Sequence, residues 1–218
     1  MLWDMDGTLI DSEPYWIEAE MSLAQRFGAV WTYDDALTVV GSPLDVSAQI
    51  LRERGIDLAV EQIIATLLER VTARARDHMP WMDDARTLLH AVHAQGIPCA
   101  LVTMSRGEFV EAFLDQAGDV FSVVVTGDQV ARGKPHPEAY LRAAQLLGVD
   151  ARECVAIEDS SAGVRSAHAA GARTIAVVRH VQVPQLEGMV QVASLEGVTP
   201  ADLAAYVHGV TAPALMAR

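Results

Sequence analysis

The 218-residue sequence is poor in aromatic residues, in cysteine and in basic side chains. Aromatic residues make up 6% of the chain, and 16 Lys and Arg stand against 29 Asp and Glu, which gives a formal net charge of −13 at pH 7. A chain this acidic lacks the basic face that sequence-independent nucleic-acid binding requires, so we expect no nucleic-acid partner. The same charge repels anionic ligands, so such a ligand has to be held by local cations.

Long apolar runs are also missing. The two cysteines, Cys99 and Cys154, lie inside apolar stretches typical of strands, which favours buried thiols over a disulfide or a nucleophile. No apolar run reaches the length of a membrane-spanning helix, and the first residues show no signal-peptide pattern. We therefore expect a cytoplasmic protein with no membrane partner and, by default, a monomer.

Apolar runs rich in β-branched residues alternate with helical patterns over residues 80–178. Strands that are apolar on both faces and alternate with helices are typical of a parallel sheet covered by helices on both sides. We predict an α/β fold with a doubly wound, Rossmann-like parallel-sheet core built from residues 1–13 and 79–218. The expected strands are Ile97–Val102, Val120–Val125, Cys154–Ile157 and Thr174–Val178, and the expected helices are Asp84–Gln95, Glu108–Ala117, Pro137–Leu147 and Ser161–Ala169.

Residues 14–78 show helical patterns only. Pro14 suits the first turn of a helix, and Trp16, Leu23 and Phe27 follow it at helical spacing. We therefore predict a small helical cap domain, inserted after the first strand of the sheet. Three further patterns are a second cap stripe (Val60, Ile63, Ile64, Leu67 and Val71), a short strand at Val190–Val192, and a last helix from Thr199-Pro200 through Val207.

Polar side chains follow four of the expected strands, at the point where each strand ends. In open α/β sheets, ligands bind at the carboxyl ends of the strands, so these side chains should meet on one rim. That rim would hold four carboxylates, which cannot all stay ionised together without a cation. The residues are Asp4 and Asp6 after the short first run, Thr103 and Met104 after the second, Lys134 after the third, and Glu158 and Asp159 after the fourth.

These residue types suit phosphoryl transfer. Oxygen ligands without cysteine or histidine favour a hard ion such as Mg²⁺, which together with Lys134 would offset the charge of a bound phosphate. Asp4 would attack phosphorus and form an aspartyl-phosphate. Asp6 would give a proton to the leaving oxygen and later take one from water, which requires a raised pKa.

The same rim offers contacts for the phosphate itself. Thr103 and the backbone amides from Met104 onward would form an anion-binding edge, and Gly7 would let the chain turn toward the same ligand. Taken alone, each motif has a structural explanation, and the order and placement of all of them favour a site. The structural explanations are a turn or helix cap at the D-x-D-G-T string, a helix N-cap at Thr103, a solvated lysine at Lys134, and a helix N-terminus at Glu158-Asp159.

Four motifs follow one another along nearly the whole chain: DMDGTLIDS, VTMS, GKPHPEAY and IEDSSAGVRSAHAAG. They resemble the haloacid dehalogenase-like superfamily, in its phosphatase and phosphomutase branch with a helical cap. The resemblance implies Asp4 as nucleophile, Asp6 as general acid and base, and a small phosphorylated metabolite, such as a sugar or polyol phosphate, as substrate. The implied Mg²⁺ ligands are Asp4, the backbone carbonyl of Asp6, Asp159 and, through water, Glu158, and the implied phosphoryl ligands are Thr103 and Lys134.

The cap separates the alternative activities. Relatives that are β-phosphoglucomutase-like resemble this chain but carry a histidine where Trp16 stands, and a lysine and an arginine at the positions of Val40 and Leu44. Without these groups we predict a phosphatase, with a phosphomutase as the alternative and a catalytically silent binding module as a third possibility. Dehalogenase chemistry is disfavoured, because relatives that cleave carbon–halogen bonds lack an acid at the position of Asp6.

The cap is also expected to control access to the rim. We expect it to close over the strand ends and exclude water, moving on hinges near Ser12 and Met79–Met82. Trp16 on the first cap helix is predicted either to face the substrate or to pack inside the cap.

Overall fold

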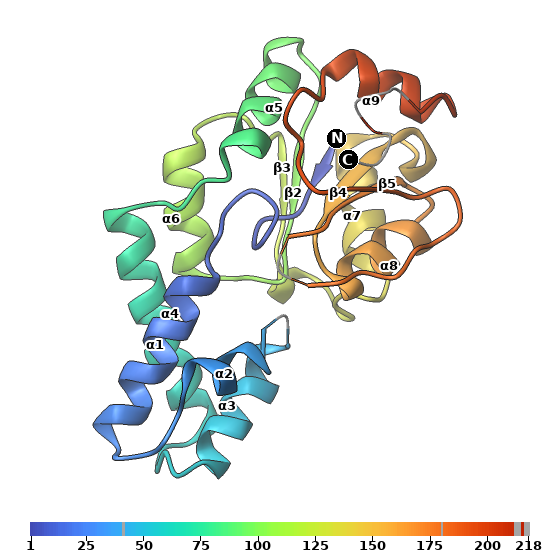
Figure 1. Ribbon diagram of the computed structural model, residues 1–218. Helices are drawn as coiled ribbons and strands as arrows, with labels where there is room; N and C mark the ends of the chain where they lie inside the picture. The colour runs from blue at the N-terminus through green and yellow to red at the C-terminus, as the bar shows by residue number, and fades with distance from the viewer. Residues whose placement is uncertain (41, 180, 212–214, 216–218) are drawn as a thin grey trace.

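A six-stranded parallel sheet forms the centre of the larger lobe of the molecule (Figure 1). The computed structural model describes residues 1–40, 42–179, 181–211 and 215. The strand order is β3-β2-β1-β4-β5-β6, with every neighbouring pair parallel, as predicted for a doubly wound core. The strands are β1 (Leu2–Trp3), β2 (Ala100–Val102), β3 (Val123–Val125), β4 (Val155–Glu158), β5 (Arg173–Val177) and β6 (Val190–Val192).

Helices cover both faces of this sheet because successive strand residues point to opposite sides. Trp3, Leu101 and Ile157 belong to a buried cluster that also contains residues of α5 (Asp83–Ala94), α6 (Glu108–Ala117) and α9 (Pro200–Val207). Their neighbours in the strands join a second cluster with α7 and α8. The members of that cluster include Leu2, Ala100 and Ala156 with residues of α7 (Glu138–Leu147) and α8 (Ser161–Ala169), and short 3₁₀ turns lie at Gly127–Gln129 (η1) and Ala151–Glu153 (η2).

The central strand β1 is only two residues long, yet it is held on both sides. Leu2 pairs with Ala100 of β2 and with Ala156 of β4. The N–H of Asp4 extends the ladder by donating to the carbonyl of Ile157 at 3.1 Å. The nucleophile candidate is therefore fixed by the sheet itself.

A separate helical lobe, described within residues 13–77, lies below the sheet in Figure 1. Its longest helix, α4, packs against α1 and α3 and also against α6 of the core. No strand occurs among the described residues 14–78, in agreement with the helical pattern of the sequence. The cap boundaries at 14 and 78 stay a prediction. The helices are α1 (Glu13–Arg26), α2 (Tyr33–Leu37), α3 (Leu44–Glu53) and α4 (Val60–Asp77).

The predicted tail elements are present as β6 and α9. Thr199 caps α9 by accepting a hydrogen bond from the N–H of Asp202, and Pro200 occupies its first turn, which is where proline suits a helix. Among the described residues, none of the helices is both long and apolar enough to cross a membrane.

Candidate active site

The strand ends bring the predicted polar residues together around one ammonium group. Lys134, the only lysine in the sequence, lies in the loop before α7 and is 5% exposed. Its Nζ donates to Asp4 Oδ1 at 2.6 Å, to Glu158 Oε1 at 2.6 Å and to the carbonyl of Val102 at 2.8 Å. Lys134 is therefore a buried member of the site, and the alternative of a solvated loop lysine is wrong.

Three buried carboxylates form the acidic side of the site. Asp4, Glu158 and Asp159 each place one carboxylate oxygen within 4.8 Å of the others. Asp159 reaches this position because Gly7 has no side chain: a Cβ on Gly7 would lie 1.9 Å from Asp159 Oδ2, and Gly7 also has a φ of +80°. Oxygen donors gathered in this way suit a hard divalent cation.

Negative charge exceeds positive charge in this cluster. Burial, and then the charge of Glu158, raise the pKa of Asp4 to about 7, although Lys134 opposes the shift. Burial and the charges of Asp4 and Glu158 also raise the pKa of Asp159 well above its ordinary value. Burial alone would lower the pKa of Lys134, but its two carboxylate partners outweigh that effect and raise it. A divalent cation would supply the missing positive charge, so the residues fit a metal.

The carboxylate of Asp6 is held by two hydroxyl groups. Ser12 Oγ donates to Oδ1 at 2.6 Å, and Ser105 Oγ donates to Oδ2 at 2.8 Å. Burial raises the pKa of Asp6, whereas these two hydrogen bonds act in the opposite direction. Among the described residues, the side chain of Asp6 is not part of the three-carboxylate cluster. Its carboxylate is thus set apart from the metal candidates and can carry a proton.

Thr103 and Met104 lie at the same rim, after β2, but their contacts differ from those of a helix cap. Thr103 Oγ1 accepts a hydrogen bond from the N–H of Ser105 at 2.9 Å, while α6 begins only at Glu108. The sulfur of Met104 accepts from the N–H of Lys134 at 3.3 Å. Met104 therefore supports the lysine loop, and the phosphate contacts expected of Thr103, Met104 and Gly7 remain predictions.

Tyr140 is a member of the site that the sequence reasoning missed. Its hydroxyl donates to Glu158 Oε1 at 2.6 Å, and the Lys134 ammonium lies 5.2 Å from the centre of its ring. Tyr140 stands on the apolar face of α7 among alanines. A hydroxyl on such a face needs a buried polar partner, which is the signal that could have identified it.

Trp16 of α1 contacts the core domain. Its ring packs edge-on against Phe109 of α6, with ring centroids 5.9 Å apart. Glu13 and Ile17, its neighbours on α1, line the large pocket of the helical lobe. Trp16 therefore contributes to the contact between the helical lobe and the core, and its expected contact with the substrate stays a prediction.

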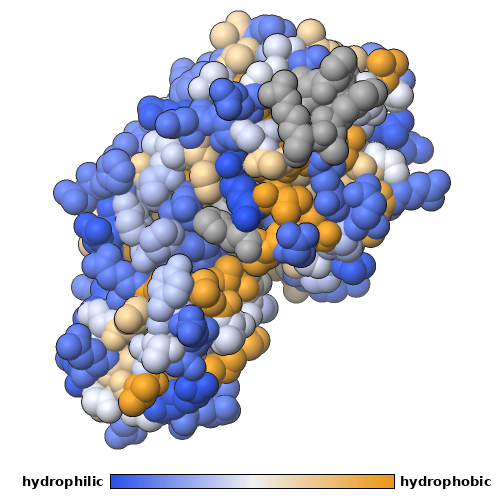
Figure 2. Space-filling model, viewed as in Figure 1, coloured by the Kyte–Doolittle hydropathy of each residue, from blue (hydrophilic) through white to orange (hydrophobic). Residues whose placement is uncertain are grey.

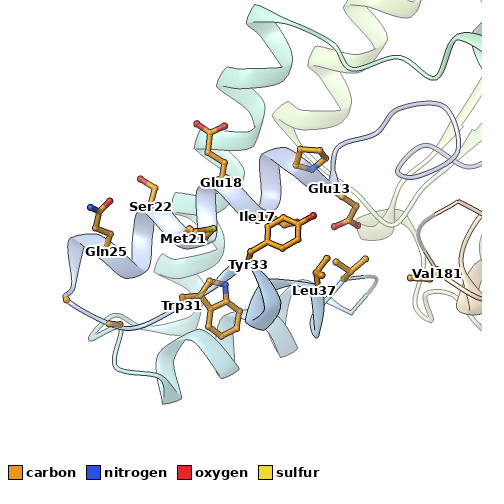
Figure 3. A pocket seen from close by; sticks show the side chains of 14 residues that line it. Glu13, Ile17, Glu18, Met21, Ser22, Gln25, Trp31, Tyr33, Leu37 and Val181 are labelled. Atoms are coloured by element: carbon orange, nitrogen blue, oxygen red, sulfur yellow. The ribbon is translucent and has the colours of Figure 1, made fainter.

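The pocket has a volume of 980 Å³ and is lined almost entirely by the helical lobe (Figure 3). Figure 3 shows Gln25 and Ser22 at one end, and Glu13, Leu37 and the core residue Val181 at the other. The space-filling view shows apolar side chains exposed on this lobe next to the core (Figure 2). The exposed large hydrophobic residues of the helical lobe include Met21, Tyr33 and Leu37, which are 38%, 57% and 48% exposed.

Comparison with known proteins identifies the family. The model of the haloacid dehalogenase-like hydrolases matches residues 1–177. Hexitol phosphatase A of Escherichia coli (strain K12) is 36% identical over 203 residues, 91% of this chain and 92% of that protein. A phosphorylated carbohydrates phosphatase of Thermotoga maritima is 33% identical over 187 residues, 83% of this chain and 85% of that protein.

A solved structure agrees with the sequence comparison. A variant of CbbY from Rhodobacter sphaeroides, in complex with xylulose 1,5-bisphosphate, has a TM-score of 0.81 at 26% identity and covers 93% of this chain and 97% of its own. The two curated relatives above are named phosphatases, as expected for a phosphoric monoester hydrolase. The family match covers the catalytic motifs that carried the resemblance. The chain belongs to the haloacid dehalogenase-like hydrolase family.

Proposed function

We propose that the protein is a Mg²⁺-dependent phosphatase that hydrolyses a small phosphorylated metabolite, of the sugar- or polyol-phosphate kind, through an aspartyl-phosphate. The observation that carries the proposal is the ammonium of Lys134 between Asp4 and Glu158, beside a separately held Asp6. The relatives support the substrate class, because they are named for phosphorylated hexitols and carbohydrates.

In the proposed reaction a carboxylate oxygen of Asp4 attacks phosphorus, forming the Asp4–phosphorus bond as the bond from phosphorus to the leaving oxygen breaks. Asp6 gives its proton to that leaving oxygen, and later takes one from the water that hydrolyses the aspartyl-phosphate. The raised pKa of Asp6 supports this role, because a buried acid keeps its proton closer to neutrality. The ammonium of Lys134 offsets the charge of the transferring group.

Asp4, Glu158 and Asp159, together with the backbone carbonyl of Asp6, are the residues proposed to hold Mg²⁺. When bound, the ion supplies positive charge that stabilises the phosphoryl group in the transition state. We also propose that the protein is cytoplasmic and monomeric.

Residues 14–78 are proposed to act as a cap that closes over the rim. Its two connections to the core run side by side, because the N–H of Asp11 donates to the carbonyl of Pro80 and the N–H of Met82 donates to that of Leu9, both at 2.8 Å. Ser12, next to this paired segment, binds Asp6 directly. Movement at this hinge would therefore change the hydrogen bond between Ser12 and the proposed general acid Asp6.

Phosphate release from 4-nitrophenyl phosphate tests the proposal. We expect EDTA to abolish the activity and added Mg²⁺ to restore it. Asp4→Asn should abolish turnover, while Asp6→Asn should reduce kcat by about 10²- to 10⁴-fold. Glu69→Gln, which changes an exposed carboxylate on α4, is the control. Full activity without metal, or in Asp4→Asn, would contradict the mechanism.

The alternative is a phosphomutase, which must hold a second phosphate during the reaction. Among the described residues, those that line the cap pocket include no lysine, arginine or histidine, which supports the phosphatase. Incubation with β-glucose 1-phosphate and a trace of the 1,6-bisphosphate separates the two activities. Glucose 6-phosphate that accumulates faster than free phosphate would favour the mutase. A protein that turns over neither this pair nor any member of a phosphometabolite panel would be a silent binding module.

A further inference from the structure

At the end that borders the core, the described residues of the cap pocket carry negative charge only. Glu13 lies at this end with Leu37 and Val181 (Figure 3). Arginines contact pocket residues away from this end: Arg70 binds Ser22, Arg74 binds Glu18, and Arg54 lies over the ring of Trp31. Near the rim, therefore, the described pocket residues present a carboxylate without a cation.

The carboxylate of Glu13 has no hydrogen-bond donor among the described residues. Within the described part of the chain, no hydrogen bond or salt bridge reaches its carboxylate, although the side chain is partly buried. Burial, and then the negative charges of Asp6, Glu20 and Asp11, raise its pKa to about 7. A partly buried polar group without partners gains from a ligand that supplies them.

Glu13 also stands close to the reacting centre. It directly follows Ser12, whose hydroxyl donates to Asp6 Oδ1 at 2.6 Å, and in the proposed mechanism Asp6 faces the leaving oxygen. The part of the substrate that follows this oxygen therefore passes Glu13. Beyond Glu13 it meets apolar side chains from two helices, Ile17 and Met21 of α1 and Tyr33 and Leu37 of α2.

We propose that this face of the cap selects leaving groups that donate hydrogen bonds to Glu13 and carry no second anionic group. The favoured substrates are monophosphates of hydroxylated or amine-bearing molecules, with an apolar side that covers Tyr33 and Leu37. Bisphosphates and phosphorylated carboxylic acids are rejected. The proposal rests on the proposed phosphatase function, and it separates this chain from the CbbY variant that was solved with a bisphosphate.

The physical basis is repulsion between like charges in a partly desolvated pocket. Two unit charges about 6 Å apart at an effective dielectric constant of about 20, screened by salt, repel each other strongly enough for a discrimination on the order of tenfold. An ammonium at the same place is attracted, and a hydroxyl donates without a charge penalty. The order of preference should therefore follow the charge of the leaving group.

Three probes of similar size test this order: phosphoethanolamine, glycerol 1-phosphate and phosphoglycolate. For the wild-type protein with Mg²⁺ at about pH 8.5, above the pKa of about 7 so that Glu13 is ionised, we expect kcat/KM for the first two to exceed that for phosphoglycolate by about tenfold or more. Glu13→Gln should shrink this ratio several-fold, and Glu13→Lys should reverse it. Glu69→Gln, which makes the same change of net charge outside the pocket, should leave the ratio as it is.

The generic substrate 4-nitrophenyl phosphate distinguishes a failure of the proposed phosphatase function from a failure of the proposed charge selection. If the wild-type protein does not hydrolyse it, the proposed function fails. If it is hydrolysed but phosphoglycolate is an equal or better substrate than the other two probes, the charge selection is wrong. An equal change of the ratio in Glu13→Gln and Glu69→Gln would also overturn it, because the effect would then come from the net charge of the chain. Melting temperatures of the variants confirm that each is folded.

Discussion

Glu20 is a buried carboxylate of the helical lobe that accepts a hydrogen bond from Trp31, and replacing it with glutamine should make the protein more stable at pH 8. The side chain is 5% exposed, and Trp31 Nε1 donates to its Oε2 at 3.1 Å. Burial raises its pKa from 4.5 to about 7, although the Trp31 hydrogen bond opposes the shift. Ionising Glu20 therefore costs the folded protein about 3 kcal/mol more than the unfolded chain.

The sign of the pH dependence follows from the raised pKa. Below pH 4.5 Glu20 is protonated in both states, and its contribution to stability is fully present. This contribution is lost as the pH rises through about 7, because the unfolded chain ionises first. Glutamine can still accept a hydrogen bond from Trp31, but burying its N–H groups without an acceptor reduces the gain in stability by about 1 kcal/mol. We expect Glu20→Gln to raise the free energy of unfolding by about 2 kcal/mol at pH 8, with no gain at pH 4.5.

Urea unfolding in EDTA, followed by circular dichroism at both pH values, measures this difference. Glu69→Gln is the matched control, since it removes an exposed carboxylate from α4 of the same lobe. A variant that is less stable than the wild type at pH 8, or that gains equally at both pH values, would refute the reasoning. The first result would mean that Glu20 is ionised and favourable in the folded protein.

Three further predictions concern the site itself. Gly7→Ala places a methyl group against Asp159, so Mg²⁺ affinity in calorimetric titration should fall by about tenfold or more; unchanged affinity would remove Asp159 from the metal site. Tyr140→Phe deletes the hydrogen bond to buried Glu158 and should lower the free energy of unfolding by about 1.5–3 kcal/mol, whereas an unchanged urea midpoint would argue against that bond. Ser105→Ala removes a hydrogen bond that favours ionised Asp6, so the alkaline limb of the kcat/KM profile should move to higher pH, and a move to lower pH would contradict the role of Asp6 as acid.

The sequence pattern was sufficient to predict the sheet but not where its ladders begin. A strand was expected over Ile97–Val102, whereas β2 starts at Ala100. The regular ladder with β1 begins where Ala100 pairs with Leu2, and before it Pro98 only accepts a single hydrogen bond from the α-amino group of Met1. β3 is shortened in the same way, because its pairing begins with Val123 opposite Ala100. An apolar run indicates that a segment is buried, whereas the residue at which a strand begins depends on its pairing with the adjacent strand.

The site could be predicted wherever the position of a strand end decided it. Asp4 and Lys134 are 130 residues apart, yet they meet because both follow parallel strands. The hydroxyl groups on Asp6 were not predicted, since spacing does not tell which way a serine hydroxyl turns. The contact of Trp16 with Phe109 of the core could not be predicted either: helical spacing groups the residues that share a face of α1, but it does not tell which face turns toward the core.

That the chain has one lysine makes this residue a chemical reporter. All 15 other basic side chains among the 16 Lys and Arg are arginines, which do not react with amine-directed reagents under mild conditions. In the folded protein Lys134 is almost completely covered, by Asp4 and Glu158 among others. Acylation of its side chain therefore requires the site to open. Apart from the α-amino group, the extent of labelling of the whole protein would count opening events of the active site alone.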